Sequence, residues 1–467
     1  MIRASSCDGH AARPEPTRHV GSPREPGGHV VPFIAFLGIS TMSNFARAGA
    51  VALVASTLAT AGWSTKAEAQ SQPRPDVQEP RKGESYEPIG IPVGGFRLFP
   101  VLELIEQYNT NIFATEHDKK DDLITIVRPS LELRSNWNNH MLNLFASAGF
   151  GIYASHSSED YKDFRVGFDG RLDIQRNWYL YGGVQFNHLH EDRADPNATS
   201  SGKLDEYNQL SANLGHYVKF NRLSLKLDGR IDDITYTNNK SATPDTISSR
   251  DRDRTEYTES LRVAYEFIDN YEAWVQGGLN QRVYDRKVDS GGFRRSSNAW
   301  EVLAGATIDF GGITQVEFFG GYRDQNYDDP RFGHLRGPIF GLTGTWNPLV
   351  PLFVKPFVKR TIEETVSTSY IGYWATIFGV TVDYDLRPNI KLTSSFSYTI
   401  ADYKKTKSAV GVTNRSDDYI TFEIGLRYLP TENFFIGPSY QFSNRNSNLP
   451  DTDFGRHLFS IRIGAQL

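Results

Sequence analysis

The chain ends in HLFSIRIGAQL, residues 457–467, a stretch in which two kinds of side chain alternate. Phe459, Ile461 and Ile463 are apolar, whereas the residues between them are polar or small. Successive side chains of a β-strand point to opposite faces, so this stretch predicts a strand with one apolar and one polar face. Both a soluble sandwich and a closed membrane barrel can end on such a strand.

The same alternation recurs along most of the chain after Phe96. It is clearest in residues 142–152, 164–175, 223–231, 390–398 and 420–428. Helical periodicity is nowhere comparable, and no run of about eighteen apolar residues follows position 70. These features predict an all-β chain and exclude a membrane protein built of helices.

The connections between the predicted strands alternate strictly between short and long. The short ones are residues 135–140, 175–178, 220–222, 268–270, 310–312, 347–350, 386–389 and 430–433. The long, polar ones are residues 111–122, 155–163, 190–206, 237–256, 286–298, 324–334, 362–369, 404–418 and 444–457. A soluble sandwich has no reason to keep this order. A barrel in an asymmetric membrane does, with tight turns on the periplasmic side and long loops outside.

The order of the connections therefore predicts a single transmembrane antiparallel up-and-down β-barrel with short periplasmic turns and long extracellular loops. Seventeen connections join eighteen strands, an even number that puts both ends of the barrel segment on one side. The last strand would close the barrel against the first, residues 96–108, and remove the open edge. Pro100 weakens the prediction of the first strand, and Pro351 and Pro356 weaken that of strand 351–360, so sixteen strands is the alternative.

The N-terminal part has the pattern of a secretory signal over residues 42–69. Positive charge precedes the apolar residues 48–63, and the small residues Ala67 and Ala69 fit a cleavage site. These patterns predict secretion across the inner membrane, cleavage of the signal, and insertion into the outer membrane of a Gram-negative bacterium. The predicted segments are an upstream extension or disordered leader (1–41), the signal peptide (42–69), a disordered periplasmic lead-in (70–95) and the barrel (96–467).

Charge and cysteine content exclude several classes of function. The formal net charge of −5 gives no reason to expect a nucleic-acid partner. The one cysteine, Cys7, precedes the signal, so the barrel has no disulfide and no thiolate for catalysis or metal binding. No serine stands in a recognisable catalytic setting, and glycine-rich phosphate motifs are missing. We therefore predict no enzyme activity and no cofactor.

Aromatic residues gather next to the short turns, where a membrane barrel carries an interfacial girdle. They are Trp137, Trp178, Tyr179, Phe220, Phe267, Tyr271, Trp274, Phe310 and Trp346. The alternative is that they are ordinary strand-end aromatics of a soluble protein.

The alternation assigns a set of charged residues to the polar face, which lines the lumen of a barrel. These are Arg165, Asp169, Arg171, Asp173, Lys226, Asp228, Arg230, Arg262, Glu266, Arg282, Glu317, Arg323, Lys355, Lys359, Glu423, Arg427 and Arg462. About eighteen strands enclose enough space for water, so charged walls are expected. Two interpretations stay open. The charges form a mixed-charge pore that steers polar or ionic solutes, or they pair across neighbouring strands and fill the lumen.

Two further patterns have a chemical and a structural interpretation. His188 and His190 are spaced to share one face of a strand, but no third ligand is specified, and we predict no metal site. RDRDR (250–254) and YDDP (327–330) are either solvated loop charge or a bridge to divalent ions and lipopolysaccharide phosphates. The expected partners are outer-membrane lipid and lipopolysaccharide.

Residues 108–144, YNTNIFATEHDKKDDLITIVRPSLELRSNWNNHMLNL, resemble the start of a proteobacterial family of outer-membrane β-barrel porins. Shorter pieces follow the same pattern, namely EDYKDF (159–164), HLHEDR (188–193), RDR (250–252), YDDP (327–330), TIEET (361–365) and the closing strand. The resemblance covers nearly all of the chain after residue 96. It implies an outer-membrane barrel inserted by the barrel-assembly machinery, and it brings no catalytic residues. Leu467 departs from the aromatic residue that ends many outer-membrane proteins.

The function expected from these patterns is porin-like passage of polar solutes. Some members of the resembled family are associated with exopolysaccharide loci, which implies polysaccharide as a solute or an anchored partner. The alternative is a non-conducting structural or adhesion barrel whose extracellular loops bind a partner. A third, less favoured reading is an outer-membrane hydrolase that uses loop residues.

Overall fold

The computed structural model describes residues 88–198, 202–237, 243 and 246–467, all within the compact unit Ala50–Leu467. The predicted upstream extension and signal peptide lie outside these residues. The described part contains nineteen β-strands and two short 3-10 turns, η1 (Ser157–Glu159) and η2 (Ser249–Arg252). None of its helices is long and apolar enough to span a membrane.

The strands follow one another along the chain without an intervening α-helix. They are β1 (Ile91–Val93), β2 (Phe96–Asn109), β3 (Asp122–Ser135), β4 (Met141–Tyr153), β5 (Tyr161–Gln175), β6 (Trp178–His190), β7 (Glu206–Phe220), β8 (Leu223–Tyr236), β9 (Arg254–Ile268), β10 (Tyr271–Tyr284), β11 (Ser297–Asp309), β12 (Thr314–Tyr327), β13 (His334–Leu349), β14 (Leu352–Glu364), β15 (Tyr370–Arg387), β16 (Ile390–Lys405), β17 (Ser416–Thr431), β18 (Phe434–Ser447) and β19 (Phe454–Gln466).

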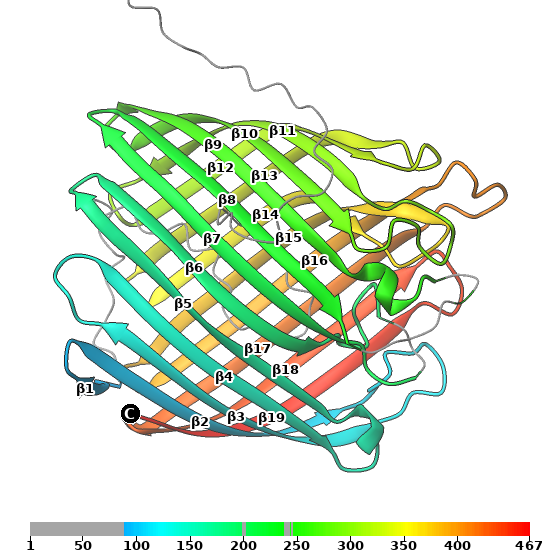
Figure 1. Ribbon diagram of the computed structural model, residues 1–467. Coiled ribbons are helices and arrows are strands. Elements are labelled where there is room, and N and C mark those ends of the chain that lie inside the picture. The colour runs from blue at the N-terminus through cyan, green and yellow to red at the C-terminus, as the bar shows by residue number, and fades with distance from the viewer. Residues whose placement is uncertain (1–87, 199–201, 238–242, 244–245) are drawn as a thin grey trace, which may run out of the picture. The chain divides into compact units, whose positions relative to one another are not determined.

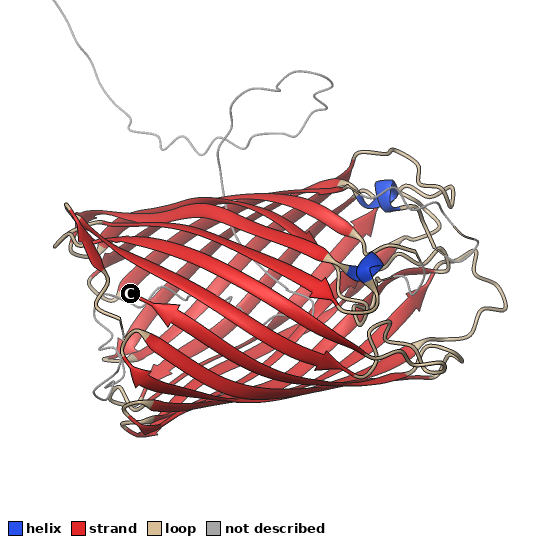
Figure 2. Cartoon of the chain, turned by 90° about the horizontal axis from the view of Figure 1, so that it is seen from below, coloured by secondary structure: helices blue, strands red, loops and turns tan. Residues whose placement is uncertain are grey.

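Strands β2 to β19 form one closed antiparallel sheet (Figure 1). Each pairs with the next strand in the chain, and β19 pairs with β2 from Leu458↔Asn109 to Gln466↔Val101. The fold is a closed up-and-down barrel of eighteen strands, so the predicted fold class and strand number are confirmed and the sixteen-strand alternative is wrong. The strands run steeply oblique to the barrel axis, as closure of a sheet requires (Figure 2).

The connections lie at the two ends as predicted. Eight short turns gather at one end, where Gln466 also completes β19, and nine longer loops gather at the other (Figures 1 and 2). We call these the short-turn end and the long-loop end. Strand β1 pairs with the start of β2, Ile91 opposite Leu98. It falls within residues 70–95, where we expected a lead-in without structure.

The barrel has the opposite polarity to a soluble protein. Its exposed side chains are large and apolar along nearly every strand, and examples are Leu104, Phe168, Leu227, Val302, Phe396 and Ile461. The charged residues on the same strands are mostly half-buried or buried, and exposed ones such as Lys162 and Asp233 lie toward the long-loop ends of their strands. Because side chains alternate across a strand, the apolar face is the outside of the barrel and the polar face is the inside.

The aromatic residues predicted to form a girdle at the short turns face outward, except at two positions. Trp137, Phe220 and Phe310 are about half exposed. Tyr179 and Trp274, by contrast, are only 5% and 2% exposed, and both lie on the inner face. Successive side chains of a strand face opposite sides, and the adjacent residues Trp178 and Val275 face outward. Tyr179 and Trp274 must therefore face inward.

Proline lies next to some of the register shifts of the sheet, whereas others, such as the one between Tyr271 and Glu272, have no proline nearby. The register between β13 and β14 shifts between Trp346 and Leu349, next to Pro348. The register between β17 and β18 shifts between Tyr428 and Thr431, next to Pro430. Proline has no N–H for the ladder, so a bulge is the expected response near a turn. Strand β14 tolerates Pro356 without a shift opposite Val380.

Candidate functional site

The charged residues assigned to the lumen lie on the inner face of eight strands. They are Arg165, Asp169, Arg171 and Asp173 on β5; Lys226, Asp228 and Arg230 on β8; Arg262 and Glu266 on β9; Arg282 on β10; Glu317 and Arg323 on β12; Lys355 and Lys359 on β14; Glu423 and Arg427 on β17; and Arg462 on β19. Each is buried or half-buried, between neighbours that face outward. Their role in conduction stays a prediction.

Many of these charges pair with opposite charges across the inner face. Arg262 lies 3.0 Å from Glu317, and Lys355 lies 3.2 Å from Asp383. Arg282 on β10 contacts Glu364 on β14, four strands away. A pair that skips three strands can form only across the concave inner surface. Many of the inner charges are therefore paired, and steering of polar or ionic solutes by a mixed-charge pore stays a prediction.

Several inward aromatic rings lie flat against glycines of a neighbouring strand and carry a cation. A Cβ on Gly305 would lie 2.6 Å from Cζ2 of Trp274, and the Arg262 guanidinium is 3.7 Å from the Trp274 ring centre. Phe435 lies against Gly464 in the same way, with Arg427 at 3.7 Å. Glycine thus lets the ring approach the wall, and the cation–π contact holds the guanidinium over it.

The long-loop end of the lumen is narrowed by an apolar cluster on the inner face. Leu335, Ile362 and Trp374, near the long-loop ends of their strands, pack with residues of the loops 285–296 and 328–333. From these loops Phe293 and Phe332 stack with ring centres 4.8 Å apart. The loops are therefore held by hydrophobic burial on the inside of the barrel.

Residues 191–198, which follow β6 and which we call the strap, join distant parts of the wall. At one side Asp192 accepts a hydrogen bond of 2.7 Å from Arg456 of β19. At the other, Asn197 donates to the Glu364 carbonyl (3.3 Å) and accepts from the Val366 N–H (3.2 Å). Strands β6 and β14 are eight apart in a ring of eighteen, so these contacts lie over the mouth of the barrel.

The strap holds buried charge. Its Glu191 pairs with Arg252 at 3.0 Å, and both side chains are about nine-tenths buried. Asp195 is fully buried, accepts the Asn197 N–H at 2.7 Å, and has one carboxylate oxygen, Oδ2, without a hydrogen-bond partner among the described residues. Burial, and then the nearby Glu191 carboxylate, raise the pKa of Asp195 to about 7.

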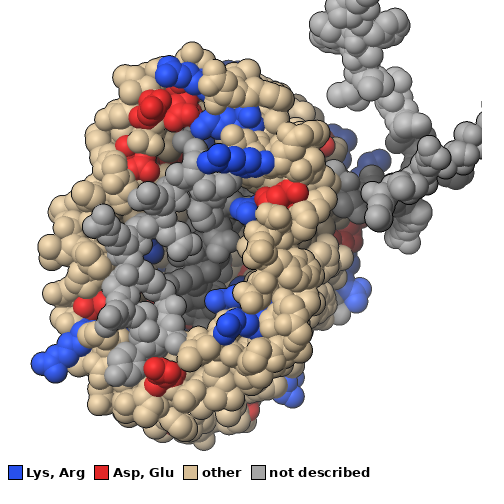
Figure 3. Space-filling view, turned by 90° about the vertical axis from the view of Figure 1, so that its left-hand side faces the viewer, with Lys and Arg blue, Asp and Glu red and all other residues tan. Residues whose placement is uncertain are grey.

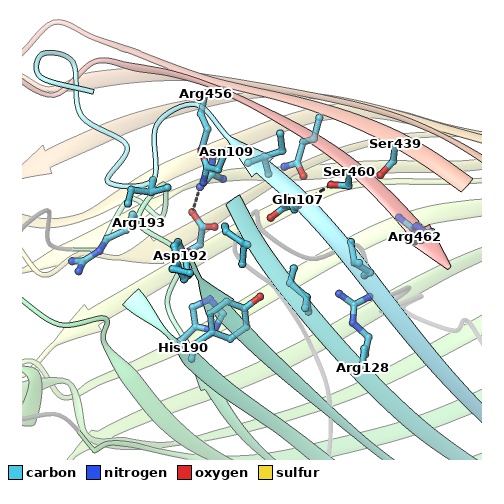
Figure 4. A pocket seen from close by; sticks show the side chains of 18 of the residues that line it. Gln107, Asn109, Arg128, His190, Asp192, Arg193, Ser439, Arg456, Ser460 and Arg462 are labelled. Atoms are coloured by element: carbon cyan, nitrogen blue, oxygen red, sulfur yellow. Dashed lines mark hydrogen bonds and ion pairs between the residues drawn. The ribbon is translucent and has the colours of Figure 1, made fainter. Parts of the chain in front are cut away.

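A polar pocket lies beneath the strap, on the inner wall where the barrel closes (Figure 4). Most of its wall comes from β2, β3, β18 and β19, with single residues from β4, β5, β6 and β17, and its cover includes Asp192 and Arg193 of the strap. Arg128, Arg456 and Arg462 reach it from the wall, and Gln107 donates a hydrogen bond of 3.1 Å to Ser460 within it. The pocket encloses about 120 Å³.

The short-turn end differs from this arrangement. Seen from that end, the described side chains form a ring with basic and acidic residues on its rim (Figure 3). The turns there are two to five residues long, between β5 and β6 at 176–177 and between β3 and β4 at 136–140, for example.

The loop charges singled out in the sequence are paired within the protein. In RDRDR, Asp251 is buried and accepts hydrogen bonds from Ser290 and Arg286, so its pKa falls to about 2 although burial alone would raise it. In YDDP, Asp329 pairs with Arg331 at 2.7 Å. The Asp251 contacts join the loop before β9 to the loop after β10, and the Arg294 N–H, which donates to Asp329 at 3.0 Å, joins the loop after β10 to the loop after β12. Contact with lipopolysaccharide remains a prediction.

The two histidines with metal-like spacing do not come together. His188 contacts Asn208 at 2.8 Å and packs near Phe164, whereas His190 contacts Asp163 at 2.9 Å and stacks on Tyr161. Each ring already has a partner. A different trio, Glu116, His117 and Asp451, brings three potential ligand atoms within 4.8 Å of one another on two outer loops.

The sequence prediction missed most of the pocket. Arg128 follows Ile124 and Ile126 on β3 with the same parity, so the alternation could have assigned it to the lumen. Arg456 has the same parity as Arg462 on β19, but it lies within the predicted loop 444–457 and was not assigned to the lumen. Its contact with Asp192 could not have been found by alternation. That contact joins a strand start to a loop 264 positions away, and no periodicity indicates it.

A sequence model of a protein family described as "Putative beta-barrel porin 2" matches residues 84–467. No curated protein is significantly similar to the chain. Among solved structures, the outer membrane protein opdK from Pseudomonas aeruginosa is similar at 12% identity and a TM-score of 0.41, covering 79% of this chain and 99% of its own. OprD from the same organism is 11% identical, with a TM-score of 0.42 and coverage of 84% and 97%. Acinetobacter baumannii OccAB3 is 11% identical, with a TM-score of 0.43 and coverage of 80% and 100%.

Proposed function

The chain belongs to the family described as "Putative beta-barrel porin 2", and from that premise we propose that it is an outer-membrane channel for small polar solutes. Passage runs through the lumen from the long loops to the short turns. The strap and the loops packed beside it act as the narrow part of the path. The signal over residues 42–69 would direct the chain across the inner membrane.

The observation that carries this proposal is the polarity of the barrel. An apolar outside is stable against lipid, and a charged inside is stable only in contact with water or with paired charges. Eighteen strands enclose a lumen wide enough for water in membrane barrels of this size. Among the inner charges, Arg165 and Arg462 have no ion-pair or hydrogen-bond partner in the described chain, which supports a hydrated interior.

Single-channel recording of the folded protein in a planar bilayer tests the proposal. We expect discrete current steps, with a conductance below that of an unobstructed barrel of the same strand number because loops narrow the mouth. A protein shown by heat-modifiable migration to be folded, yet electrically silent under all voltages and pH values, would contradict it.

A second candidate function is a non-conducting structural or adhesion barrel. The apolar cluster and the strap favour it, since both fill part of the long-loop end. It predicts silence in the bilayer and loss of partner binding when an exposed loop such as 404–418 is shortened. Its loops would then act as a binding surface and its lumen as a support.

We further propose that polysaccharide is among the solutes, as the resemblance to porins of exopolysaccharide loci implies. The measurement is interruption of the current by soluble oligosaccharides added to one side. A catalytic role is not part of the proposal, because the family is one of porins and no hydrolase constellation was identified in the sequence.

A further inference from the structure

We propose that the pocket beneath the strap is a subsite for one carboxylate group of a polyhydroxylated solute, such as a sugar acid, with Arg462 and Arg128 as the anion-binding residues. The inference rests on the proposed function, because it names the class of solute that the lumen selects. It depends on the pairing of the charges in the pocket, the neutral groups beside them and the size of the space.

Arg462 differs from the other arginines of the pocket in its partners. Arg128 is paired with Glu103 (3.4 Å), Arg193 with Glu159 (2.7 Å) and Arg456 with Asp192 (2.7 Å). Arg462 has no ion-pair or hydrogen-bond partner among the residues that the structure describes. A half-buried guanidinium without a partner is the group that a solute anion can satisfy.

The surroundings of Arg462 increase its attraction for an anion. Arg128 on one side and Arg427 on the other are close enough to repel it electrostatically. A carboxylate placed between Arg462 and Arg128 would relieve that repulsion and could accept hydrogen bonds from both.

The neutral lining of the pocket suits hydroxyl groups. Ser439 and Ser460 offer hydroxyls, and Gln107, Asn109 and Gln441 offer amides that both donate and accept. The enclosed space of about 120 Å³ is smaller than the roughly 300 Å³ of pockets that hold a whole drug-sized ligand. One acidic unit would therefore enter the pocket while the remainder of the solute stays in the lumen.

The acidic groups near the pocket favour a carboxylate over a phosphate. Asp192 and Glu423 both line it, so a doubly charged anion would meet stronger repulsion than a singly charged one. Glu423 also provides a test of sign, because its neutralisation should improve anion binding while neutralisation of Arg462 weakens it.

Calorimetry with the detergent-folded protein measures the subsite without requiring conduction. The probe is sodium glucuronate, compared with glucose, benzoate and inorganic phosphate. We expect glucuronate to bind, glucose not to bind, Arg462→Gln to weaken binding at least about tenfold, and Glu423→Gln to strengthen it. The matched control is Arg165→Gln, which removes another unpaired inner charge on β5 outside the pocket.

The outcomes separate this inference from the proposed function. Equal loss in Arg462→Gln and Arg165→Gln would mean that general lumen charge binds the anion, and the subsite would be abandoned. Equal binding of benzoate and glucuronate would keep the carboxylate and refute the role of the hydroxyls. Tighter binding of phosphate would refute the carboxylate. Glucuronate binding in a barrel that never conducts would overturn the channel and retain the subsite, and conduction without binding would do the reverse.

Discussion

At the scale of single residues, glycine decides how close an inward ring can lie to the barrel wall. Trp274 lies against Gly305, and a side chain at 305 would also collide with the Phe318 carbonyl oxygen. Gly277 lies on the outer face, two residues after Val275, and a Cβ added to it would have no atom within 4 Å. The inner and outer glycines of one hairpin therefore have different tolerance for substitution.

We expect Gly305→Val to destabilise the barrel by about 1–3 kcal/mol, the usual range for overpacking, and Gly277→Val to change stability much less. The displaced Trp274 should also release Arg262 from its ring contact. Urea unfolding in detergent micelles, followed by tryptophan fluorescence, measures both variants. Equal stability of the two would show that Trp274 does not need this glycine.

A second prediction at this scale concerns Arg282, which pairs with Glu256 (3.4 Å) and also contacts Glu364. Arg282→Met leaves two inner carboxylates without their shared cation. Breaking a buried pair on one side costs about 3–5 kcal/mol, so we expect marked destabilisation and, in the surviving channels, a shift toward cation selectivity. Reversal potentials in a salt gradient measure the shift. An unchanged reversal potential would place Arg282 away from the ion path.

At the scale of an element, the strap contains a buried carboxyl group, that of Asp195, whose protonation changes the stability of the strap. Asp195 faces Glu191, Asp192 and Arg252, and its pKa is raised to about 7 from an ordinary 3.8. An open strap would expose the carboxyl to water, and its pKa would return toward the ordinary value. The closed strap therefore binds the proton more tightly than the open one.

The sign of the pH dependence follows from that difference. The protonated carboxyl stabilises the closed strap fully below about pH 4, and this contribution is lost as the pH rises through about 7. We expect the conductance at pH 5 to be lower than at pH 8, and Asp195→Asn to keep the low value at both. Asp118→Asn, on an exposed outer loop, is the control. A pH response that survives in Asp195→Asn would assign it to another group.

At the scale of the whole molecule, the order of the strands was predictable from the sequence, whereas the contacts of the strap across the mouth of the barrel were not. Alternation such as that of 164–175 has a period that is visible in any window, and the short and long connections fix its topology. The contact of Asn197 with Val366 joins two irregular loops 169 positions apart, and only the curvature of the finished barrel brings them together. The alternation along each strand was enough to assign residues to the lumen. The pocket could not be predicted in this way, because the curvature of the barrel brings its cover over its wall.

The reversed polarity also makes a prediction for the whole barrel. Phe168 is central in β5 and 45% exposed, a position that in a soluble protein would accept arginine at little cost. Against lipid we expect Phe168→Arg to destabilise the barrel by about 2–4 kcal/mol. The inward neighbour variant Asp169→Asn should have a small effect. Reversible unfolding from lipid vesicles measures both, and a neutral Phe168→Arg would argue against a lipid-facing surface there.

The seam between β2 and β19 sets the order in which the barrel can be completed. Every other ladder joins neighbours in the chain, but Leu458 must meet Asn109 across almost the whole sequence. Joining such distant ends costs the most chain entropy of any step. Until it happens, the molecule is an open sheet with two unpaired rows of N–H and C=O groups. An assembly factor that pairs a strand of its own with either row would therefore assist the step that costs the most chain entropy.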